Sequence, residues 1–313
     1  MSGEKDILDS RWDLSGLEFD SVLSQDPLTK TIALLCRERG TNDRAVVVLS
    51  RRAFSESDAA AILSDKSKLE LQFQNDIYSK YAGILPTELA QVNIDITSPA
   101  TDKHISKHQA QSYSMIHETP EDYRSVVLPF IEAIPANRTQ WVDNILAGKA
   151  EAERVLHNDQ SESTGFVLLP DMKWDQTDND SLYCVAISHR KDIRSLRDLR
   201  SEHLPLLRNI MRQSCQVLEN KFAIKSDHLR IYVHYQPSYY HFHVHFSSMK
   251  QLGSGLLAGK AHVLSDVIDN IATIAPDYYA KRTLAFALGE RDPLFEAFCK
   301  RKAATMVGHD PDS

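Results

Sequence analysis

The sequence predicts an α+β fold arranged in two domains. Its 313 residues are enough for two domains of ordinary size. Apolar runs with the spacing of strands and apolar runs with the spacing of helices both occur along the chain. A polar stretch at residues 95–118 has no clear apolar period, and it separates a smaller N-terminal part from a larger C-terminal part.

The N-terminal part contains short segments with strand character and one short helix. Residues 31–36 and 45–49 are apolar and rich in β-branched side chains, and residues 69–73 alternate between apolar and polar, so all three predict strands. Ser55 and Asp58 have the spacing of a capping box ahead of the apolar run 59–63, which predicts a helix there. Residues 1–25 are polar, and we expect a loosely held tail.

The C-terminal part mixes helical and strand-like segments. Helical spacing is predicted for 119–154 and for a long helix at 201–221, whose apolar residues form one stripe. The last fifty residues are expected to be mostly helical. Strands are predicted at residues 166–169, 182–187, 229–234, 240–246 and 283–288.

Composition and charge exclude some classes of protein. The hydrophobic fraction of 42% and the charged fraction of 25% are those of an ordinary globular protein. A net charge of −7 argues against a protein that holds long nucleic acid, because such binding needs a basic surface. A small anionic ligand is still compatible, since a pocket can be locally basic on an acidic protein.

Cysteines and hydropathy predict the cellular setting. The four cysteines lie far apart and form no CxxC pair, which argues against a disulfide framework or a zinc-thiolate site. The N-terminus is polar, without an apolar core of signal-peptide length, and no segment has the apolar length of a membrane span. We expect an intracellular protein without a membrane partner.

A run of alternating histidines is the main candidate for chemistry. On a strand, His241, His243 and His245 would point to one side, and the apolar residues between them would point to the other. Spacing alone leaves three interpretations open. The imidazoles could bind zinc, one of them could act as a covalent nucleophile, or all three could be packed histidines with structural roles.

The apolar residues between the histidines favour catalysis. The pattern of histidines alternating with Phe242, Val244 and Phe246 resembles that of the histidine-triad nucleotide hydrolases and transferases. The seventh position is Ser247, a small residue where the family has an apolar one. The resemblance implies that the middle histidine, His243, attacks a phosphorus without a metal or another cofactor.

Further segments narrow the resemblance. Four segments resemble, in their order along the chain, those of the scavenger mRNA-decapping enzymes. They are ATDKH at 100–104, WVDNIL at 141–146, PDMKW at 170–174 and HYQPSYY at 234–240. That resemblance implies a histidine-triad fold with an antiparallel sheet in the C-terminal domain, a smaller α+β N-terminal domain and a domain-swapped homodimer. The implied organisation is a flexible tail at 1–25, a swapped dimerisation and lid domain at 26–105, a hinge at 106–118 and a catalytic domain at 119–313.

The resemblance also implies a substrate. This would be an m7GpppN cap dinucleotide, or a short capped oligonucleotide, left after 3′-to-5′ mRNA decay. The products would be 7-methyl-GMP and a nucleoside diphosphate or a diphosphate-ended oligonucleotide. Such an enzyme would work in the cytoplasm and the nucleus. Two alternatives stay open: a histidine-triad hydrolase of other nucleotides, such as adenosine phosphoramidates or dinucleoside polyphosphates, and a cap-binding module without catalysis.

Roles for individual residues follow from the same resemblance. His243 would be the nucleophile, supported by His241, His245 and His234. Trp141 and Met172 would sandwich the base, since a cationic 7-methylguanine is attracted to an indole face. The substrate-binding residues would also include Glu151 at the Watson–Crick edge, and Pro170, Asp171, Lys173, Tyr183, Ser238, Tyr239, Lys103, Lys107 and Lys260.

Several of these residues have plainer interpretations. On a helix, Trp141 is compatible with a place in the core, and Glu151 with a solvated charged face. Lys260 falls where the family has an arginine, and a lysine cannot reproduce a bidentate guanidinium contact.

Overall fold

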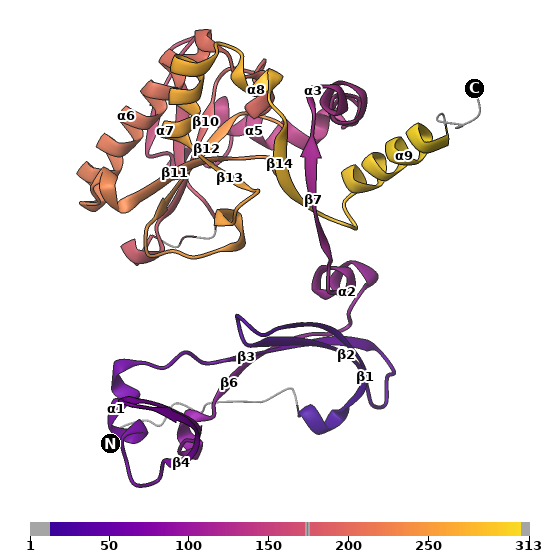
Figure 1. The fold of residues 1–313 in the computed structure, drawn as a ribbon, viewed down its shortest axis with the longest axis vertical. Coiled ribbons are helices and arrows are strands. Elements are labelled where there is room, and N and C mark those ends of the chain that lie inside the picture. The colour runs from indigo at the N-terminus through magenta and orange to yellow at the C-terminus, as the bar shows by residue number, and fades with distance from the viewer. Residues whose placement is uncertain (1–12, 173, 175, 308–313) are drawn as a thin grey trace. The chain divides into compact units, whose positions relative to one another are not determined.

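The computed structural model describes residues 13–172, 174 and 176–307. They belong to two compact units, an N-terminal unit that ends at Gln111 and a C-terminal unit that begins at Ser112 (Figure 1). Across these described ranges, the structure contains no helix that is long and apolar enough to cross a membrane.

A four-stranded antiparallel sheet forms the centre of the N-terminal unit. Its strands lie in the order β1-β2-β3-β6, with bounds β1 Leu17–Asp26, β2 Thr31–Glu38, β3 Arg44–Arg51 and β6 Val92–Thr97. Leu23 and Val46 pack on one face against Ile105 of helix α2 (Asp102–His108). Part of the segment expected to be a loose tail is therefore strand β1, because Leu23 supplies a buried side chain to this core.

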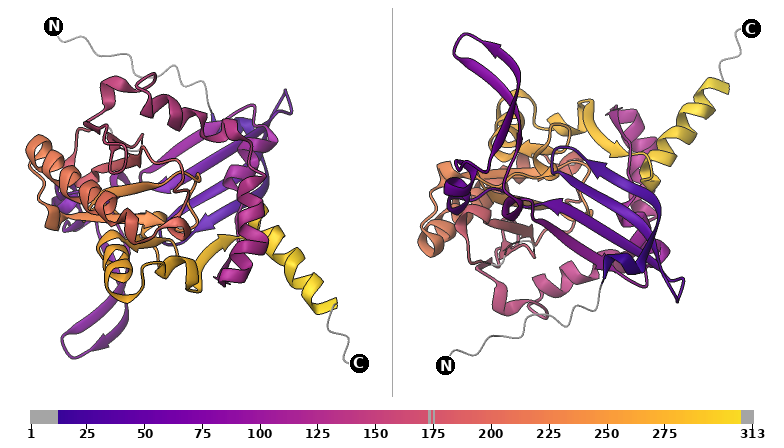
Figure 2. Two further views of the ribbon diagram at one scale, coloured as in Figure 1. Left: turned by 90° about the horizontal axis from the view of Figure 1, so that it is seen from above. Right: turned by 90° about the horizontal axis from the view of Figure 1, so that it is seen from below.

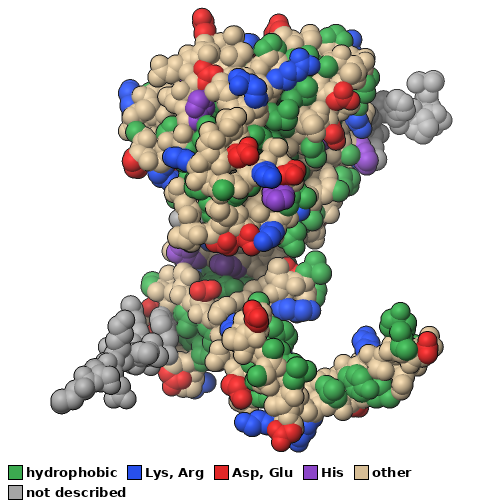
Figure 3. All heavy atoms as spheres, turned by 90° about the vertical axis from the view of Figure 1, so that its left-hand side faces the viewer, with side chains coloured by type: hydrophobic (Ala, Val, Ile, Leu, Met, Phe, Trp, Pro, Cys, Tyr) green, Lys and Arg blue, Asp and Glu red, His purple; other side chains and the backbone are tan. Residues whose placement is uncertain are grey.

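A separate hairpin projects from the N-terminal unit (Figure 2). It consists of β4 (Lys68–Asn75) and β5 (Tyr78–Ile84), and it follows helix α1 (Ala59–Ile62), which the predicted capping box of Ser55 and Asp58 precedes. The predicted strand at 69–73 is confirmed, but its apolar side chains are exposed. Figure 3 shows hydrophobic side chains along this projecting arm.

A six-stranded antiparallel sheet forms the centre of the C-terminal unit. The strands lie in the order β13-β11-β12-β10-β9-β8, with bounds β8 His157–Asp159, β9 Phe166–Pro170, β10 Tyr183–Ser188, β11 Leu229–His234, β12 His243–Ser248 and β13 Ala261–Val263. A second, two-stranded sheet pairs β7 (Tyr113–Glu118) with β14 (Leu284–Gly289). Residues 113–118, which we placed in the hinge, thus form a strand of this unit.

Helices cover the two faces of the larger sheet unequally. Helix α6 (Leu204–Phe222) and helix α7 (Leu264–Asp269) contribute to the main core, which takes alternate residues of β9, β10 and β12. The short helix α5 (Gln140–Leu146) packs on the other alternate residues of β9 and β10. The remaining helices are α3 Pro120–Asp122, α4 Leu128–Glu132, α8 Tyr278–Lys281 and α9 Pro293–Val307, with π-helical turns at Tyr123–Val127 and Asn270–Ile274.

The α+β class and most C-terminal elements are confirmed, with one correction that concerns the site. The strand predicted for 240–246 begins only at His243. Residues before it form a turn, in which the His241 backbone N–H donates to the Tyr239 carbonyl at 3.0 Å. His241 therefore lies on the loop that leads into β12, and the other two histidines lie on the strand.

Candidate active site

His243 and His245 lie on the sheet face against which α5 packs. His243 pairs with Ile187 and His245 with Val185 on the neighbouring strand β10. Residues directly opposite each other in an antiparallel pair point to the same face, and Val185 and Ile187 belong to the cluster that packs against α5. The predicted alternation therefore places His243 and His245 on the face that α5 packs against, and the residues between and after them, Val244 and Phe246, in the main core.

The tautomer of His243 is fixed by the main chain. Its Nδ1 lies 2.7 Å from the His241 carbonyl oxygen, and because a carbonyl only accepts, Nδ1 must carry the proton. Nε2 then carries the lone pair. It is buried and has no hydrogen-bond partner among the described residues. Burial lowers the pKa of His243 to about 4, so the ring is neutral at pH 7.

The other three histidines are held by specific partners. His241 Nε2 donates to the Ser188 carbonyl at 2.7 Å, and His234 Nε2 donates to the Gly255 carbonyl at 2.9 Å. The Tyr183 hydroxyl lies 3.0 Å from Nδ1 of His245. The rings of His234 and His245 are 4.3 Å apart, and those of His243 and His245 are 4.9 Å apart. We call His234, His241, His243 and His245 the histidine cluster.

Metal binding was one of the alternatives that the histidine spacing left open. In the part of the chain that the structure describes, no group of three or more His, Cys, Asp or Glu side chains could hold a metal ion. Main-chain carbonyls accept from one ring nitrogen of His241, His243 and His234, which orients these rings individually.

A cavity of about 430 Å³ lies next to the histidine cluster. Trp141 of α5 lines it with 43% of its surface exposed, and Met172 lines it with 87% exposed. Both side chains thus have free surface against which a flat ligand could stack, which disfavours a core role for Trp141. Further predicted residues that line the cavity are Glu151, Pro170, Asp171, Tyr183, His234, Ser238, Tyr239 and His245.

A second cavity, of about 740 Å³, shares part of this lining. Tyr183, His234 and Ser238 line both cavities, and Lys260 lines the second one. The Lys260 ammonium donates to the Gln236 carbonyl at 2.7 Å, and burial lowers the pKa of this lysine. The two cavities together offer an aromatic compartment and a neighbouring one with a cation at its wall.

Tyr239 links the aromatic compartment to the nucleophile. Its ring stacks on His243, with centroids 4.0 Å apart and planes 12° apart. The same ring meets the indole of Trp141 edge-on at 4.8 Å. A ligand that stacks on Trp141 would therefore lie one aromatic ring away from His243.

The structure does not test the roles predicted for three lysines. Lys103 and Lys107 are exposed on α2 of the N-terminal unit, and their contact with phosphates stays a prediction. Lys173 lies outside the described residues.

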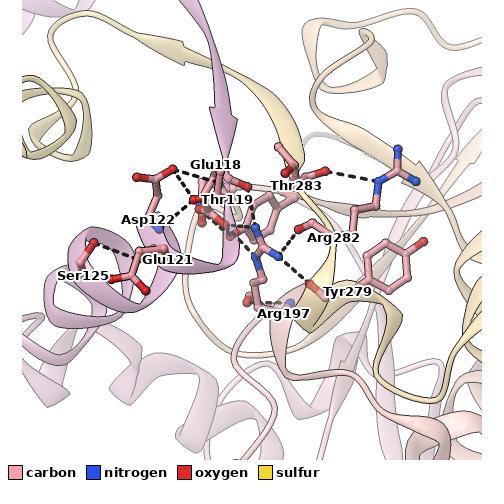
Figure 4. A network of polar contacts seen from close by, with 12 residues as sticks. Glu118, Thr119, Glu121, Asp122, Ser125, Arg197, Tyr279, Arg282 and Thr283 are labelled. Atoms are coloured by element: carbon pink, nitrogen blue, oxygen red, sulfur yellow. Dashed lines mark hydrogen bonds and ion pairs between the residues drawn. The ribbon is translucent and has the colours of Figure 1, made fainter. Parts of the chain in front are cut away.

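A buried polar network behind the site was not predicted (Figure 4). The Glu118 carboxylate pairs with the Arg197 guanidinium, and both side chains are fully buried. The same carboxylate accepts hydrogen bonds from the Tyr235 hydroxyl at 2.8 Å and from Gln236 Nε2 at 3.0 Å. Tyr235 and Gln236 directly follow His234, so the network anchors the loop that carries Ser238 and Tyr239. These partners are far apart in sequence, and no local pattern connects them.

Arg154 also lines the aromatic cavity, and it was not among the predicted residues. It forms an ion pair with Glu151 and donates from Nη2 to the Pro170 carbonyl at 3.0 Å. The spacing of three residues between Glu151 and Arg154 is that of neighbours on a helix, and this spacing could have indicated the pair.

Comparison with known proteins shows the family of this chain. Residues 12–111 match the family model described as scavenger mRNA decapping enzyme (DcpS) N-terminal, and residues 140–259 match the one described as scavenger mRNA decapping enzyme C-term binding. The chain is 43% identical to the m7GpppX diphosphatase of Homo sapiens over 91% of this chain and 86% of that protein. The m7GpppX diphosphatase of Schizosaccharomyces pombe is 34% identical over 93% of this chain and 96% of that protein. The chain therefore belongs to the scavenger mRNA decapping enzyme family.

Proposed function

We propose that this chain is an m7GpppX diphosphatase. It hydrolyses the 5′–5′ triphosphate of m7GpppN dinucleotides and short capped oligonucleotides, and it releases 7-methyl-GMP and a nucleoside or oligonucleotide diphosphate. The observation that carries the proposal is the buried, neutral imidazole of His243, whose lone-pair nitrogen lies one aromatic ring away from the exposed face of Trp141. The names of the relatives support the same substrate class.

The base is the part of this substrate that the aromatic cavity fits. A 7-methylguanine ring is cationic, and it would stack between Trp141 and Met172 with about 1–2 kcal/mol of cation–π attraction when desolvated. Its Watson–Crick edge carries N–H donors, and the Glu151 carboxylate would accept hydrogen bonds from them. Asp171 and Lys173 would hold the ribose and the first phosphate, and Tyr183, Ser238, Tyr239 and Lys260 would contact the remaining phosphates.

The reaction proceeds in two displacements. The Nε2 lone pair of His243 attacks the phosphorus bonded to 7-methylguanosine, an N–P bond forms, and the P–O bond to the leaving diphosphate breaks. His234 and His241 would stabilise the charge that develops on the leaving group once each ring carries a second proton, because their Nε2–H groups already donate to the Gly255 and Ser188 carbonyls. A water oxygen then attacks the same phosphorus, the N–P bond breaks, and the water proton passes to solvent. Neutral His243 is restored with 7-methyl-GMP as product.

The test is His243→Asn with m7GpppG labelled at the phosphate next to 7-methylguanosine. We expect at least a thousandfold loss of turnover, because asparagine keeps a similar shape without a nucleophilic nitrogen. The matched control is His228→Asn, since His228 is exposed in the 3-10 turn Ser226–His228 before β11. Near-normal turnover of His243→Asn would contradict the nucleophile. Incubation in ¹⁸O-water should place the heavy oxygen in 7-methyl-GMP.

The two alternative functions are separated by substrate choice. Faster hydrolysis of adenosine phosphoramidates or unmethylated dinucleoside polyphosphates than of m7GpppG would favour another histidine-triad hydrolase. Tight binding of m7GpppG without product after long incubation would favour a cap-binding module. We expect neither result, because Tyr239, which lines the aromatic cavity, stacks on the neutral His243.

We further propose that the protein is a domain-swapped homodimer. Apolar side chains on the β4–β5 hairpin are exposed, and an isolated two-stranded hairpin is marginal in water. These side chains are Leu69, Leu71, Phe73, Ile77, Tyr78, Tyr81 and Ile84. A second copy would cover them. Sedimentation should give twice the chain mass for the unsubstituted protein and a smaller mass for a Leu71→Ser/Phe73→Ser variant; a monomer before substitution would contradict the dimer.

The N-terminal unit has a proposed part in catalysis as well. Lys103 and Lys107 would reach the triphosphate when this unit closes as a lid over the site, which would exclude water during the first displacement. A role in cytoplasm and nucleus, and the absence of long nucleic-acid partners, stay predictions.

A further inference from the structure

Arg154 joins two hydrogen-bond acceptors that come from different elements of the C-terminal unit. Glu151 directly precedes the 3-10 turn Ala152–Arg154 and has a left-handed backbone, with φ 53°. The Arg154 guanidinium pairs with its carboxylate through Nη1. The same guanidinium donates from Nη2 to the carbonyl of Pro170, the last residue of β9, at 3.0 Å.

The two joined acceptors face the same ligand space. Glu151, Arg154 and Pro170 all line the aromatic cavity beside Trp141. A carboxylate offers about four acceptor positions on its two oxygens, and a carbonyl offers two. The arginine uses one position on each, so both groups keep further positions for a ligand.

The guanidinium has the shape needed to hold this pair. Its N–H donors point in fixed directions from one plane, so contacts to two acceptors fix the position of one acceptor against the other. A glutamate side chain that is one-third exposed otherwise has several rotamers open to it. The positive charge also offsets the repulsion between a carboxylate and a nearby carbonyl oxygen.

We propose that Arg154 is a positioning residue for base recognition. It holds the Glu151 carboxylate and the Pro170 carbonyl at the spacing that accepts the N1–H and the 2-amino group of a 7-methylguanine. This inference rests on the proposed function and adds a residue that sets its base specificity. A purine without the 2-amino group leaves one fixed acceptor unpaired, and it is rejected for that reason.

A competing role for Arg154 predicts the opposite result. The guanidinium could occupy the two acceptors in place of a base and leave only when a ligand displaces it. Removal of Arg154 would then tighten binding, whereas removal of a positioning residue weakens it and lowers discrimination between bases.

The experiment compares 7-methyl-GMP with 7-methyl-IMP, which lacks the 2-amino group. Their dissociation constants are measured by calorimetry on the full-length chain and on Arg154→Met and Arg154→Lys. We expect the unsubstituted chain to prefer 7-methyl-GMP about tenfold, as one hydrogen bond to a charged group predicts. Both variants should lose most of that preference, and KM for m7GpppG should rise while kcat stays within about twofold.

The controls separate positioning from general damage. Arg212→Met removes an exposed arginine of α6 and should keep the preference. Arg154→Lys retains the positive charge but cannot donate in two fixed directions, so it tests the geometry if Arg154→Met lowers the melting temperature.

Each contrary result has a distinct meaning. An unchanged preference, or tighter binding, in both Arg154 variants overturns the positioning role while the proposed function stands. Failure of the unsubstituted chain to bind 7-methyl-GMP overturns the proposed function, and the positioning role with it.

Discussion

The carboxylate of Glu118 and the guanidinium of Arg197 form an ion pair inside the C-terminal unit, with neither side chain exposed. Burial raises the pKa of Glu118, and Arg197 and the Tyr235 hydroxyl act in the opposite direction. Arg197 also donates to the carbonyls of Tyr279 and Arg282 at 2.7 and 2.6 Å. The pair therefore ties strand β7 to the end of α8 and to the loop behind the histidine cluster.

Glu118→Gln should destabilise the protein strongly. The substitution keeps the shape but leaves the Arg197 charge buried without its partner, which costs about 3–5 kcal/mol. Chemical denaturation measures the loss. The matched control is Glu121→Gln, because Glu121 forms exposed pairs with Arg124 and Arg301 and its removal should change stability by less than about 1 kcal/mol. Equal effects of the two substitutions would contradict the buried pair.

Activity should persist at a pH where an ordinary histidine is protonated. The pKa of His243 is lowered to about 4, so its Nε2 keeps the lone pair as pH falls from 7 to 5. A pH profile of kcat/KM should show no loss from this group until close to pH 4. An acid limb at about 6.5, the unperturbed value, would contradict the burial of the nucleophile.

The same lowered pKa predicts how stability depends on pH. The unfolded chain binds a proton at His243 below about pH 6.5, whereas the folded chain does so only below about 4. Folding stability contributed by this residue is therefore complete above 6.5 and is lost as pH falls towards 4. The difference in unfolding free energy between the unsubstituted chain and His243→Asn should shrink over that interval.

Gly255→Ala should reduce turnover through His234. A Cβ at Gly255 would lie 3.0 Å from Nε2 of His234, so the ring must shift from its hydrogen bond with the Gly255 carbonyl. We expect about a tenfold fall in kcat with little change in melting temperature. Gly253→Ala is the matched control, because nothing lies within 4 Å of the added Cβ. Normal kcat for Gly255→Ala would show that the ring position of His234 is not critical.

Trp141→Ala should weaken cap binding more than turnover. The indole is partly exposed at the cavity and packs edge-on against Tyr239, so its loss removes a stacking face. About 1–2 kcal/mol of cation–π attraction corresponds to a roughly tenfold rise in KM. Trp141→Phe keeps a smaller stacking face, so its KM should lie between those of the unsubstituted chain and Trp141→Ala. Steady-state kinetics with m7GpppG measures both variants, and an unchanged KM for Trp141→Ala would place the base elsewhere.

The alternation of residues along a strand predicted which histidines share a face. Alternation placed His243 and His245 on one face, because a strand has a period of two residues. It did not predict that the strand begins at His243, since the turn before it depends on the loop's own hydrogen bonds.

Contacts between residues far apart in the sequence could not be predicted from local patterns. Glu118 meets Tyr235 across 117 residues, and only the folded sheet brings them together. Likewise, the alternation at Leu69, Leu71 and Phe73 predicted the strand but did not indicate that these side chains are exposed. Alternation in a strand predicts which side chains share a face, but it does not predict whether another part of the protein covers that face.

The hydrogen bond from His243 Nδ1 to the His241 carbonyl has a consequence for how this site tolerates mutation. Many catalytic histidines are oriented by a carboxylate, which one substitution can remove. Here the acceptor is a main-chain oxygen, which every amino acid at position 241 would supply. A saturation screen of side chains would therefore miss the group that sets the tautomer of the nucleophile, and only replacement of that amide by an ester would alter it.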